Sequence, residues 1–309
     1  MNIPYTFHYG SAPREVVEKP GKHSRYPFAT ATHHRHLIFP TADFIIQQLD
    51  FPPFFIELFE LKAEDTFPLS YEVFSRQYFL FFMLEGSVTF TTSEGFYVSH
   101  AKSGHFAFAY NDKGKYVLDL PSGRYTALCI AYHPDWLHFF TEDQPVLNNF
   151  LLKNRLAEHT MLPYCRIDRG VGRWLRSHYS ELQKGRGSLD GQLRYYISLI
   201  LERYNQLAEA KLQTLPWQVK EYLDINFSFP ELSIKYLTER LKVSKEQLRG
   251  QFQAEFKVSP HHYYTCKRLA LARKLISTHN LPLRKIFHEA GYNDESALRY
   301  EMKQFGLLK

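Results

Sequence analysis

A repeat in the last third of the chain constrains the fold more than any other feature. In the first copy, Ile234, Leu237 and Leu241 fall on one helical stripe behind Ser233, whose hydroxyl suits a helix N-cap. In the second copy the matching positions are Leu283, Ile286 and Ala290. In each copy a short break then leads into a further helix. Each copy therefore predicts a helix-turn-helix unit.

Both second helices have a capped start, an apolar side and a polar side. Ser244 and Asp294 are the N-caps, 50 residues apart, and Gln247 completes a capping box in the first copy. The apolar sides comprise Leu248, Phe252 and Phe256 in the first helix, and Leu298 and Met302 in the second. The outward residues, which we predict to contact DNA, are Lys245, Glu246, Gln247, Arg249 and Gln253 in the first helix, and Glu295, Ser296, Arg299 and Lys303 in the second.

A long helix is predicted between the two copies. Ser259 and Pro260 form a cap followed by proline at the first helical position, and the helix continues over Tyr263 to Thr278. A rigid connection would fix the distance between the two recognition helices. Both could then enter successive major-groove turns on one face of DNA, ~34 Å apart.

This stretch resembles the DNA-binding domain of the AraC/XylS family of bacterial transcription regulators. The matching residues are Leu237, Leu241, Lys242, Val243, Ser244, Leu248, Phe252, Phe256, Ser259, Pro260, Arg268, Leu269, Ala272, Leu275, Ile286, Gly291, Tyr292, Asp294, Leu298, Lys303, Phe305 and Gly306. The resemblance implies a sequence-specific transcriptional regulator, contact with RNA polymerase, a homodimer and an N-terminal sensor domain for a small-molecule effector. It implies no cofactor and no catalytic residue.

The chain departs from the family pattern at several positions. Lys242 stands where the family usually has Gly in the first turn, and a left-handed conformation there would cost ~1 kcal/mol. Gly250 and Tyr300 stand where the family tends to have Arg, and the arginines lie one residue earlier, at Arg249 and Arg299. One residue turns a helix by ~100°, so these side chains are expected to point elsewhere.

The alternatives at single residues follow from their chemistry. Arg is suited to bidentate contact with guanine, whereas Lys more often contacts phosphate. Glu246, Gln247 and Glu295 equally suit helix capping, and each basic side chain on these faces could simply be solvated.

The positive charge of the chain is concentrated in the same region. From Lys211 to Lys309 there are 17 Lys and Arg and 10 Asp and Glu, a net charge of +7, while the whole chain carries +6. The remainder is therefore close to neutral, at −1. A basic C-terminal third suits a module drawn to phosphates, and it leaves another task to the N-terminal part.

The N-terminal part predicts a small barrel. Short alternating runs, such as Phe54 to Lys62, Phe79 to Glu85 and Tyr125 to Tyr132, are separated by Gly-containing turns. We therefore predict an α+β multidomain fold: a flexible arm over 1–22, a cupin-like sensor barrel or jelly roll over 23–133, a helical linker and dimerisation region over 134–212, and an all-α tandem helix-turn-helix domain over 213–309. The linker helices are expected over Val146 to His159, Arg169 to Lys184 and Ser188 to Leu212.

Aromatic residues of the barrel are the candidate ligand contacts. They are Phe79, Phe81, Phe90, Phe106, Phe108 and Tyr110, which could line a cavity or simply fill a small barrel. Likewise, the apolar stripe over Leu189 to Leu207 suits either packing within the chain or a dimer seam.

No metal site is predicted. Enzymatic cupins use two His on one strand, a Glu shortly after and a later His, but no Glu follows the run His33-His34-Arg35-His36 at that spacing. The three cysteines are far apart and odd in number, there is no signal pattern, and no apolar run approaches the ~20 residues of a membrane span. These features fit a cytoplasmic protein.

Two other functions remain open from the sequence. One is a cupin-type enzyme, metal-dependent or metal-free, with an accessory helical domain; the absent metal motif and the charge distribution speak against it. The other is an adaptor that has lost DNA contact, because both usual Arg positions are changed. Salt-sensitive DNA binding separates a regulator from both.

Overall fold

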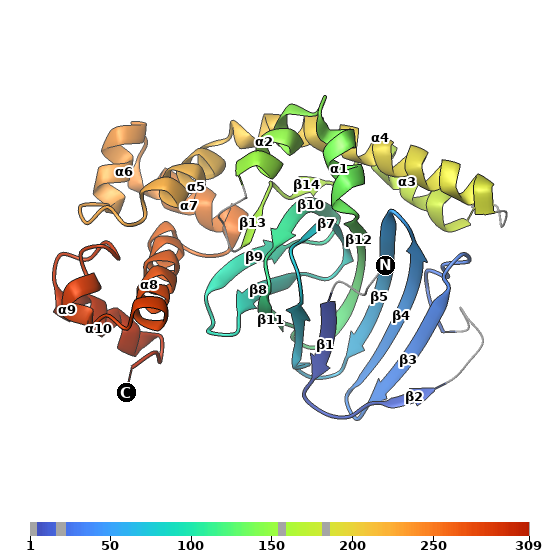
Figure 1. The fold of residues 1–309 in the computed structure, drawn as a ribbon, viewed down its shortest axis with the longest axis horizontal. Helices are drawn as coiled ribbons and strands as arrows, with labels where there is room; N and C mark the ends of the chain where they lie inside the picture. The colour runs from blue at the N-terminus through green and yellow to red at the C-terminus, as the bar shows by residue number, and fades with distance from the viewer. Residues whose placement is uncertain (1–4, 17–22, 154–158, 181–185, 309) are drawn as a thin grey trace. The chain divides into compact units, whose positions relative to one another are not determined.

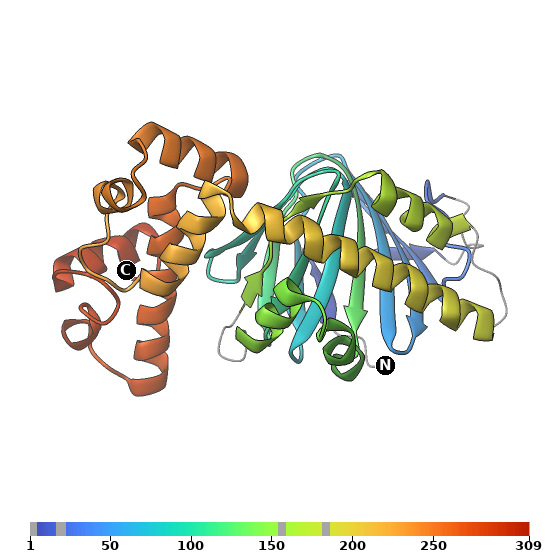
Figure 2. The ribbon, with the colours of Figure 1, turned by 90° about the horizontal axis from the view of Figure 1, so that it is seen from above.

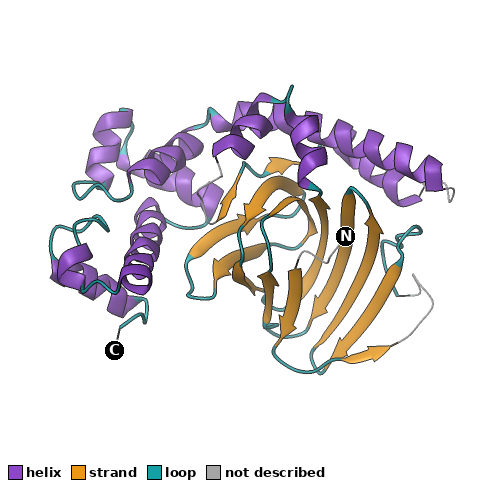
Figure 3. Cartoon of the chain, viewed as in Figure 1, coloured by secondary structure: helices purple, strands orange, loops and turns teal. Residues whose placement is uncertain are grey.

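The computed structural model describes residues 5–16, 23–153, 159–180 and 186–308. The chain divides into two compact units (Figure 1). The first comprises Met1–Thr92 and Val98–Lys211, and the second comprises Leu212–Lys309 with the short segment Ser93–Tyr97. Figure 3 shows that strands dominate the first unit and helices the second. The expected fold class, a β-rich N-terminal region followed by a helical C-terminal region, is confirmed. No described helix is long and apolar enough to cross a membrane.

Two antiparallel sheets form the first unit. The five-stranded sheet has the order β1 (Tyr5–Tyr9), β6 (Leu69–Val73), β11 (Gly114–Asp119), β8 (Val88–Thr92), β9 (Tyr97–Ala101). The larger sheet has the order β13 (His159–Met161), β10 (His105–Asn111), β7 (Gln77–Glu85), β12 (Gly123–Tyr132), β5 (Phe54–Ala63), β4 (Ala42–Phe51), β3 (His33–Phe39), β2 (Arg14–Val16), and β14 (Cys165–Arg166) pairs with β10.

One core lies between the inner faces of these sheets. Phe44 and Ile46 of β4 are buried together with Leu69 of β6 and Val88 of β8, so both sheets contribute. Alternation along each strand explains this, because every second side chain points to the same face. The predicted strands therefore form, with ends that differ by a few residues from the expected bounds.

The expected flexible arm over 1–22 is corrected by the structure. Tyr5 pairs with Val73 as β1 joins β6, and Arg14–Val16 forms β2 beside β3. The reason is an alternation that the prolines nearby obscured: Tyr5, Phe7 and Tyr9 share one side of β1. Phe7 lies edge-on to Phe59 at 5.3 Å between ring centroids. Residues 1–4 and 17–22 of the predicted arm lie outside the described part of the chain.

Four helices belong to the first unit: α1 (Pro134–Thr141), α2 (Pro145–Lys153), α3 (Arg169–Ser180) and α4 (Arg186–Leu212). Figures 1 and 2 show α4 running along the larger sheet. Tyr204 of α4 packs against Phe106 of β10 at 5.2 Å, and its hydroxyl donates to the Pro163 carbonyl at 2.8 Å. The helix expected to reach His159 ends at Lys153, and His159 begins β13; residues 154–158 and 181–185 lie outside the described residues.

The apolar stripe of α4 packs within its own unit. Leu193, Ile200 and Tyr204 from the predicted stripe are all buried. The Asn205 side-chain oxygen also accepts a hydrogen bond from the Val146 amide at 3.0 Å, which ties α4 to α2. Of the two readings of this stripe, the structure favours packing within the chain. The opposite side of α4 carries the exposed Tyr195.

Six helices form the second unit: α5 (Leu215–Asn226), α6 (Ile234–Leu241), α7 (Lys245–Phe256), α8 (Pro260–His279), α9 (Leu283–Ile286) and α10 (Glu295–Gln304). Their buried side chains make one core, to which both helix-turn-helix copies contribute. It includes Leu237, Leu248, Leu269, Ile286 and Leu298. The periodicity seen in the sequence thus produces a single folded body rather than two separate hairpins.

Candidate functional site

The first helix-turn-helix unit consists of α6, a tight turn and α7. Lys242 ends α6 in the left-handed conformation, with φ of 55°, as predicted from the missing glycine. Ser244 then caps α7, accepting a hydrogen bond from the Gln247 amide at 3.1 Å. Because α7 buries Leu248 and Phe252 on one side, its other side is free to face a ligand.

The second unit repeats this design with a shorter first helix. α9 has only four residues, and Gly291 makes the following turn with φ of 87°. A Cβ at Gly291 would lie 2.8 Å from the Arg268 side chain and from the Ser228 backbone, so this position requires glycine. Asp294 caps α10 by accepting from the Ala297 amide at 2.8 Å.

Arg268 of α8 links the two helix-turn-helix units. Its guanidinium donates to the carbonyl oxygens of Phe227 at 2.6 Å and Phe229 at 2.8 Å, in the loop between α5 and α6. The same group lies over the rings of Tyr264 and Tyr292, at 4.8 and 5.4 Å from their centroids. The buried Arg268 guanidinium therefore holds α8 against the loop that precedes α6 and against the turn that precedes α10. In the sequence, Arg268 stands out only as part of the family motif, because nothing near it indicates these distant partners.

A second charged cluster fixes α5 against α8. Asp224 accepts from Lys220 at 2.7 Å, from Lys267 at 2.9 Å and from the Tyr263 hydroxyl at 2.6 Å. Burial alone would raise the pKa of Asp224, but the two lysines outweigh it and hold the pKa well below its ordinary value. The carboxylate is thus charged and fully partnered, which suits a structural role.

All nine predicted DNA contacts lie on α7 and α10. Eight of them are exposed: Lys245, Glu246, Gln247, Arg249, Gln253, Ser296, Arg299 and Lys303. Glu295 is partly buried and binds the Arg299 guanidinium through an i,i+4 ion pair, as its spacing predicted. Gly250 and Tyr300 are also exposed, and Tyr300 keeps 62% of its surface. The outer face of α10 therefore offers fewer unengaged charges than that of α7.

The N-terminal compact unit, called the β unit below, contains an apolar cavity of about 130 Å³ between its two sheets. Of the predicted ligand contacts, Phe79, Phe81 and Phe90 line it. Phe106, Phe108 and Tyr110 do not, and this corrects their assignment. They alternate with the lining residues Ala109 and Asn111 along β10, so they point to the opposite face. There Phe108 packs against Phe150 of α2 at 5.7 Å.

A buried carboxyl group lies on the same inner face, beside the cavity-lining Tyr5 and Cys129. Glu57 accepts hydrogen bonds from the Tyr5 hydroxyl and from the Gln48 amide nitrogen. Burial raises the pKa of Glu57 from its ordinary value of 4.5 to about 7, and these two hydrogen bonds oppose that rise. Burial likewise raises the pKa of the Cys129 thiol. No local pattern in the sequence indicates this group, because Glu57 stands in an alternating strand among residues expected to be solvated.

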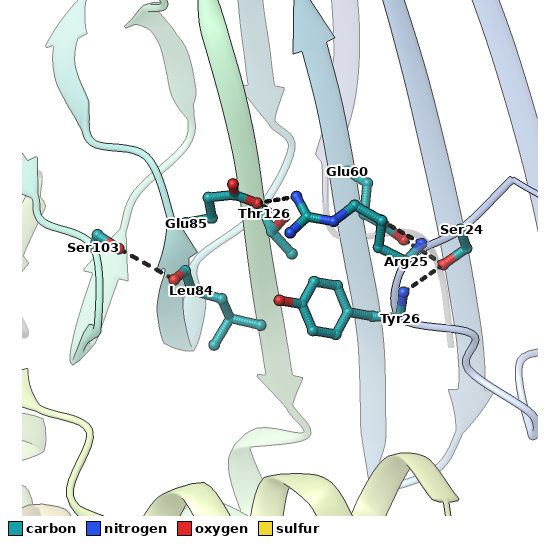
Figure 4. Close-up of polar contacts among 8 residues, drawn as sticks. All are labelled: Ser24, Arg25, Tyr26, Glu60, Leu84, Glu85, Ser103 and Thr126. Atoms are coloured by element: carbon teal, nitrogen blue, oxygen red, sulfur yellow. Dashed lines mark hydrogen bonds and ion pairs between the residues drawn. The ribbon is translucent and has the colours of Figure 1, made fainter.

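A polar hollow of about 200 Å³ lies elsewhere on this unit, lined by residues that include Arg25, Glu60 and Glu85. Figure 4 shows residues 24–26 lying across the strands, with Arg25 directed at Glu85. Ser24 donates to Glu60, which also accepts from the Arg25 amide at 2.9 Å. These contacts hold residues 24–26 against strands β5 and β7.

The described residues contain no group of three or more His, Cys, Asp or Glu that could hold a metal ion. The run His33-His34-Arg35-His36 belongs to strand β3, where His33 and Arg35 are exposed at the surface. His36 faces Asp43 at 3.6 Å, and Arg35 pairs with Glu15.

Comparisons with known proteins give a family-model match and several similar structures. Residues 237–306 match the family model described as a helix-turn-helix domain. The chain is similar to the C-terminal domain of AraT, a response regulator from Geobacillus stearothermophilus, with 23% identity, 32% of this chain and 81% of that chain covered, and a TM-score of 0.30. It is also similar to an apo variant of ToxT from Vibrio cholerae (13% identity, 82% and 93% covered, TM-score 0.33) and to the AraC-like transcriptional activator CuxR (11%, 76% and 82%, 0.33). No curated protein matches the chain.

The matched domain and its capped turns define a DNA-binding module of the helix-turn-helix class. Two helix-turn-helix units share one core around a connecting helix.

Proposed function

We propose that this chain is a DNA-binding transcriptional regulator, which reads DNA with α7 and α10 together and responds to a small molecule held in its β unit. The observation that carries the proposal is the pair of capped recognition helices, each with a buried apolar side and an exposed polar side. The connecting helix α8 and the Arg268 contacts make their separation fixed. Two helices held this way suit successive major-groove turns on one DNA face.

Base readout is assigned mainly to α7. Arg249 lies one turn from Lys245 and Gln253, and no ion pair is formed by Arg249 among the described residues. Arg299, by contrast, is engaged by Glu295. We therefore assign specific base contacts to Arg249 and mainly phosphate contacts to Lys303.

The effector site assigned to the β unit is the cavity lined by Phe79, Phe81 and Phe90. A cavity between two sheets, with few polar groups, has the features of a small-molecule site. This assignment also accounts for the near-neutral charge of the N-terminal part. The family resemblance further supports a homodimer, contact with RNA polymerase and the absence of a catalytic role. Sedimentation of the full chain with and without DNA distinguishes a dimer from a monomer.

A binding-site selection followed by a spacing change tests the reading of DNA. The full chain should select two short conserved blocks about one helical turn apart. Inserting roughly 5 base pairs, half a turn, between them should then abolish specific binding, because α8 does not let the helices separate. A single selected block, or binding that tolerates the insertion, would refute the tandem reading.

A further inference from the structure

The inner cavity of the β unit retains apolar surface that the core does not cover. Phe7, Phe59 and Phe81 are only partly buried, although all three lie on inner faces of the sheets. Tyr71 beside them is also partly exposed, yet burial raises the pKa of its hydroxyl well above the ordinary value. These side chains therefore show their open surface to the cavity rather than to bulk water.

The described side chains that line the cavity carry no ionic group. Of all its lining residues, only Ser99, Asn111, Cys129 and the tyrosines have polar atoms. The Asn111 amide nitrogen donates to the Tyr71 hydroxyl at 3.0 Å, and the Tyr5 hydroxyl is directed to Glu57. Among the described residues, no Lys, Arg or His lines the cavity to neutralise an anion. A charged ligand would lose its hydration on entering the cavity and would gain no counter-charge there, at a large free-energy cost.

Glu57 adds to this discrimination. Its carboxyl group lies behind Tyr5 and shares a cross-strand pair with the cavity-lining Cys129. Whenever Glu57 is ionised, its charge opposes any further negative charge in the same low-dielectric interior. When it is protonated, it offers no positive charge to attract one. In either state the site is unfavourable to carboxylates.

The volume limits the size of an occupant. The cavity measures about 130 Å³. An apolar protein cavity of about 150 Å³ accommodates benzene. One ring with a small substituent therefore matches this space, whereas an extended acyl chain is larger than it.

We propose that the effector is an uncharged, largely apolar molecule of about one ring, with at most one hydrogen-bonding group facing Asn111 and Tyr71. This inference rests on the proposed function, because it specifies the ligand class of the same effector site. The apolar walls supply most of the binding, and the absence of a cation excludes the corresponding acids.

Calorimetric titration of the full chain with three matched probes tests the proposal: 4-methylphenol, benzoate at pH 7.5, and oleate. We expect 4-methylphenol to bind at least about tenfold more tightly than benzoate, because only benzoate brings a charge into the apolar interior. We expect oleate to bind more weakly than 4-methylphenol. Equal or tighter binding of benzoate or oleate, or no binding of 4-methylphenol, would overturn the inference.

Cavity-filling variants locate the binding. Ala109 lines the cavity on β10, opposite Phe79 of β7. Ala109→Leu should remove 4-methylphenol binding, and Val98→Phe on β9 is the second variant if the first fails to fold. Ala210→Leu, the same change at an exposed position of α4, is the control and should bind normally. Undiminished binding by a folded cavity-filled variant would place the ligand elsewhere and overturn the proposal.

Measuring DNA binding on the same samples separates this inference from the proposed function. Salt-sensitive DNA binding without 4-methylphenol binding overturns the cavity inference but not the proposed DNA-binding function. Binding of 4-methylphenol that is lost in Ala109→Leu, with no DNA binding under any condition, supports the ligand class and overturns the proposed function.

Discussion

Gly250 is an exposed residue in the middle of α7, where glycine weakens a helix. A Cβ at this position would meet nothing within 4 Å, so the fold does not require glycine there. We predict that Gly250→Ala stabilises the DNA-binding unit by roughly 0.5–1 kcal/mol yet weakens DNA binding about tenfold, since the methyl group intrudes where the helix approaches the groove.

Thermal unfolding and mobility shift measured together on Gly250→Ala provide the check. Gly191 of α4 is an exposed helical glycine with equally open surroundings, so Gly191→Ala is the matched control. It should stabilise the chain without altering DNA affinity. Undiminished DNA binding by Gly250→Ala would show that α7 does not approach DNA closely at this residue.

Glu57 makes the stability of the β unit depend on pH. Its pKa is about 7 when folded, against an ordinary value of 4.5. The folded state therefore holds more protons than the unfolded chain between these values, and stability falls as pH rises through that window. The two pKa values imply a loss of roughly 3 kcal/mol from this group.

Denaturant unfolding of wild type and Glu57→Gln from pH 4 to 8 measures this term. The difference in unfolding free energy should shift in favour of Glu57→Gln by roughly 3 kcal/mol across the range. His34 has a lowered pKa from burial and acts in the opposite direction, but it does so in both proteins and cancels in the difference. Parallel pH profiles of the two proteins would contradict a raised pKa for Glu57.

At the scale of single elements, the two recognition helices are unequal. Arg299 of α10 is held by Glu295, whereas no described acidic side chain pairs with Arg249 of α7. We predict that Arg249→Ala costs about 1–3 kcal/mol at the selected site and relaxes one base position. Arg299→Ala should cost less and act uniformly across sequences.

Binding-site selection at fixed salt with both variants measures the asymmetry. Glu295→Gln serves as a companion, because it releases Arg299 and removes a negative charge near the phosphates, so it should strengthen binding. Equal and position-specific losses from Arg249→Ala and Arg299→Ala would refute the assignment of base readout to α7.

How far the sequence predicts each element depends on whether its signal is local. The caps at Ser244 and Asp294 and the Glu295–Arg299 pair follow from neighbours within a few residues, and the structure contains them. The left-handed Lys242, which the structure also contains, follows from the family pattern of a glycine at that turn. Strand β1 does not follow from local patterns, because its partner β6 lies at least sixty residues away. DNA contact by the predicted residues remains a prediction.

The same limit governs the ligand site. Phe79 and Phe106 look equivalent in the sequence, yet the alternation of side chains along their strands places them on opposite faces of the sheet. Which of the two alternating sets of side chains faces the core depends on how the strands pair, and the sequence leaves that pairing open. The buried state of Glu57 and the contacts of Arg268 likewise depend on distant segments.

For the whole molecule, the distribution of charge is the property that connects the two units to their tasks. Residues 211–309 carry a net charge of +7, and the remainder carries −1. A basic domain releases counterions when it binds DNA, so its affinity depends steeply on salt. The β unit has no comparable excess, and its cavity is lined by uncharged side chains.

Salt titration of DNA binding tests the central claim most directly. We predict that the full chain binds its selected duplex with an affinity that falls steeply with salt, with a slope of log K against log salt of about −4 or steeper, as expected for several phosphate contacts. Residues 214–309 alone should give a similar slope, since the basic excess lies there. A folded chain whose DNA affinity is undetectable at low salt, or unchanged between low and physiological salt, would contradict the account.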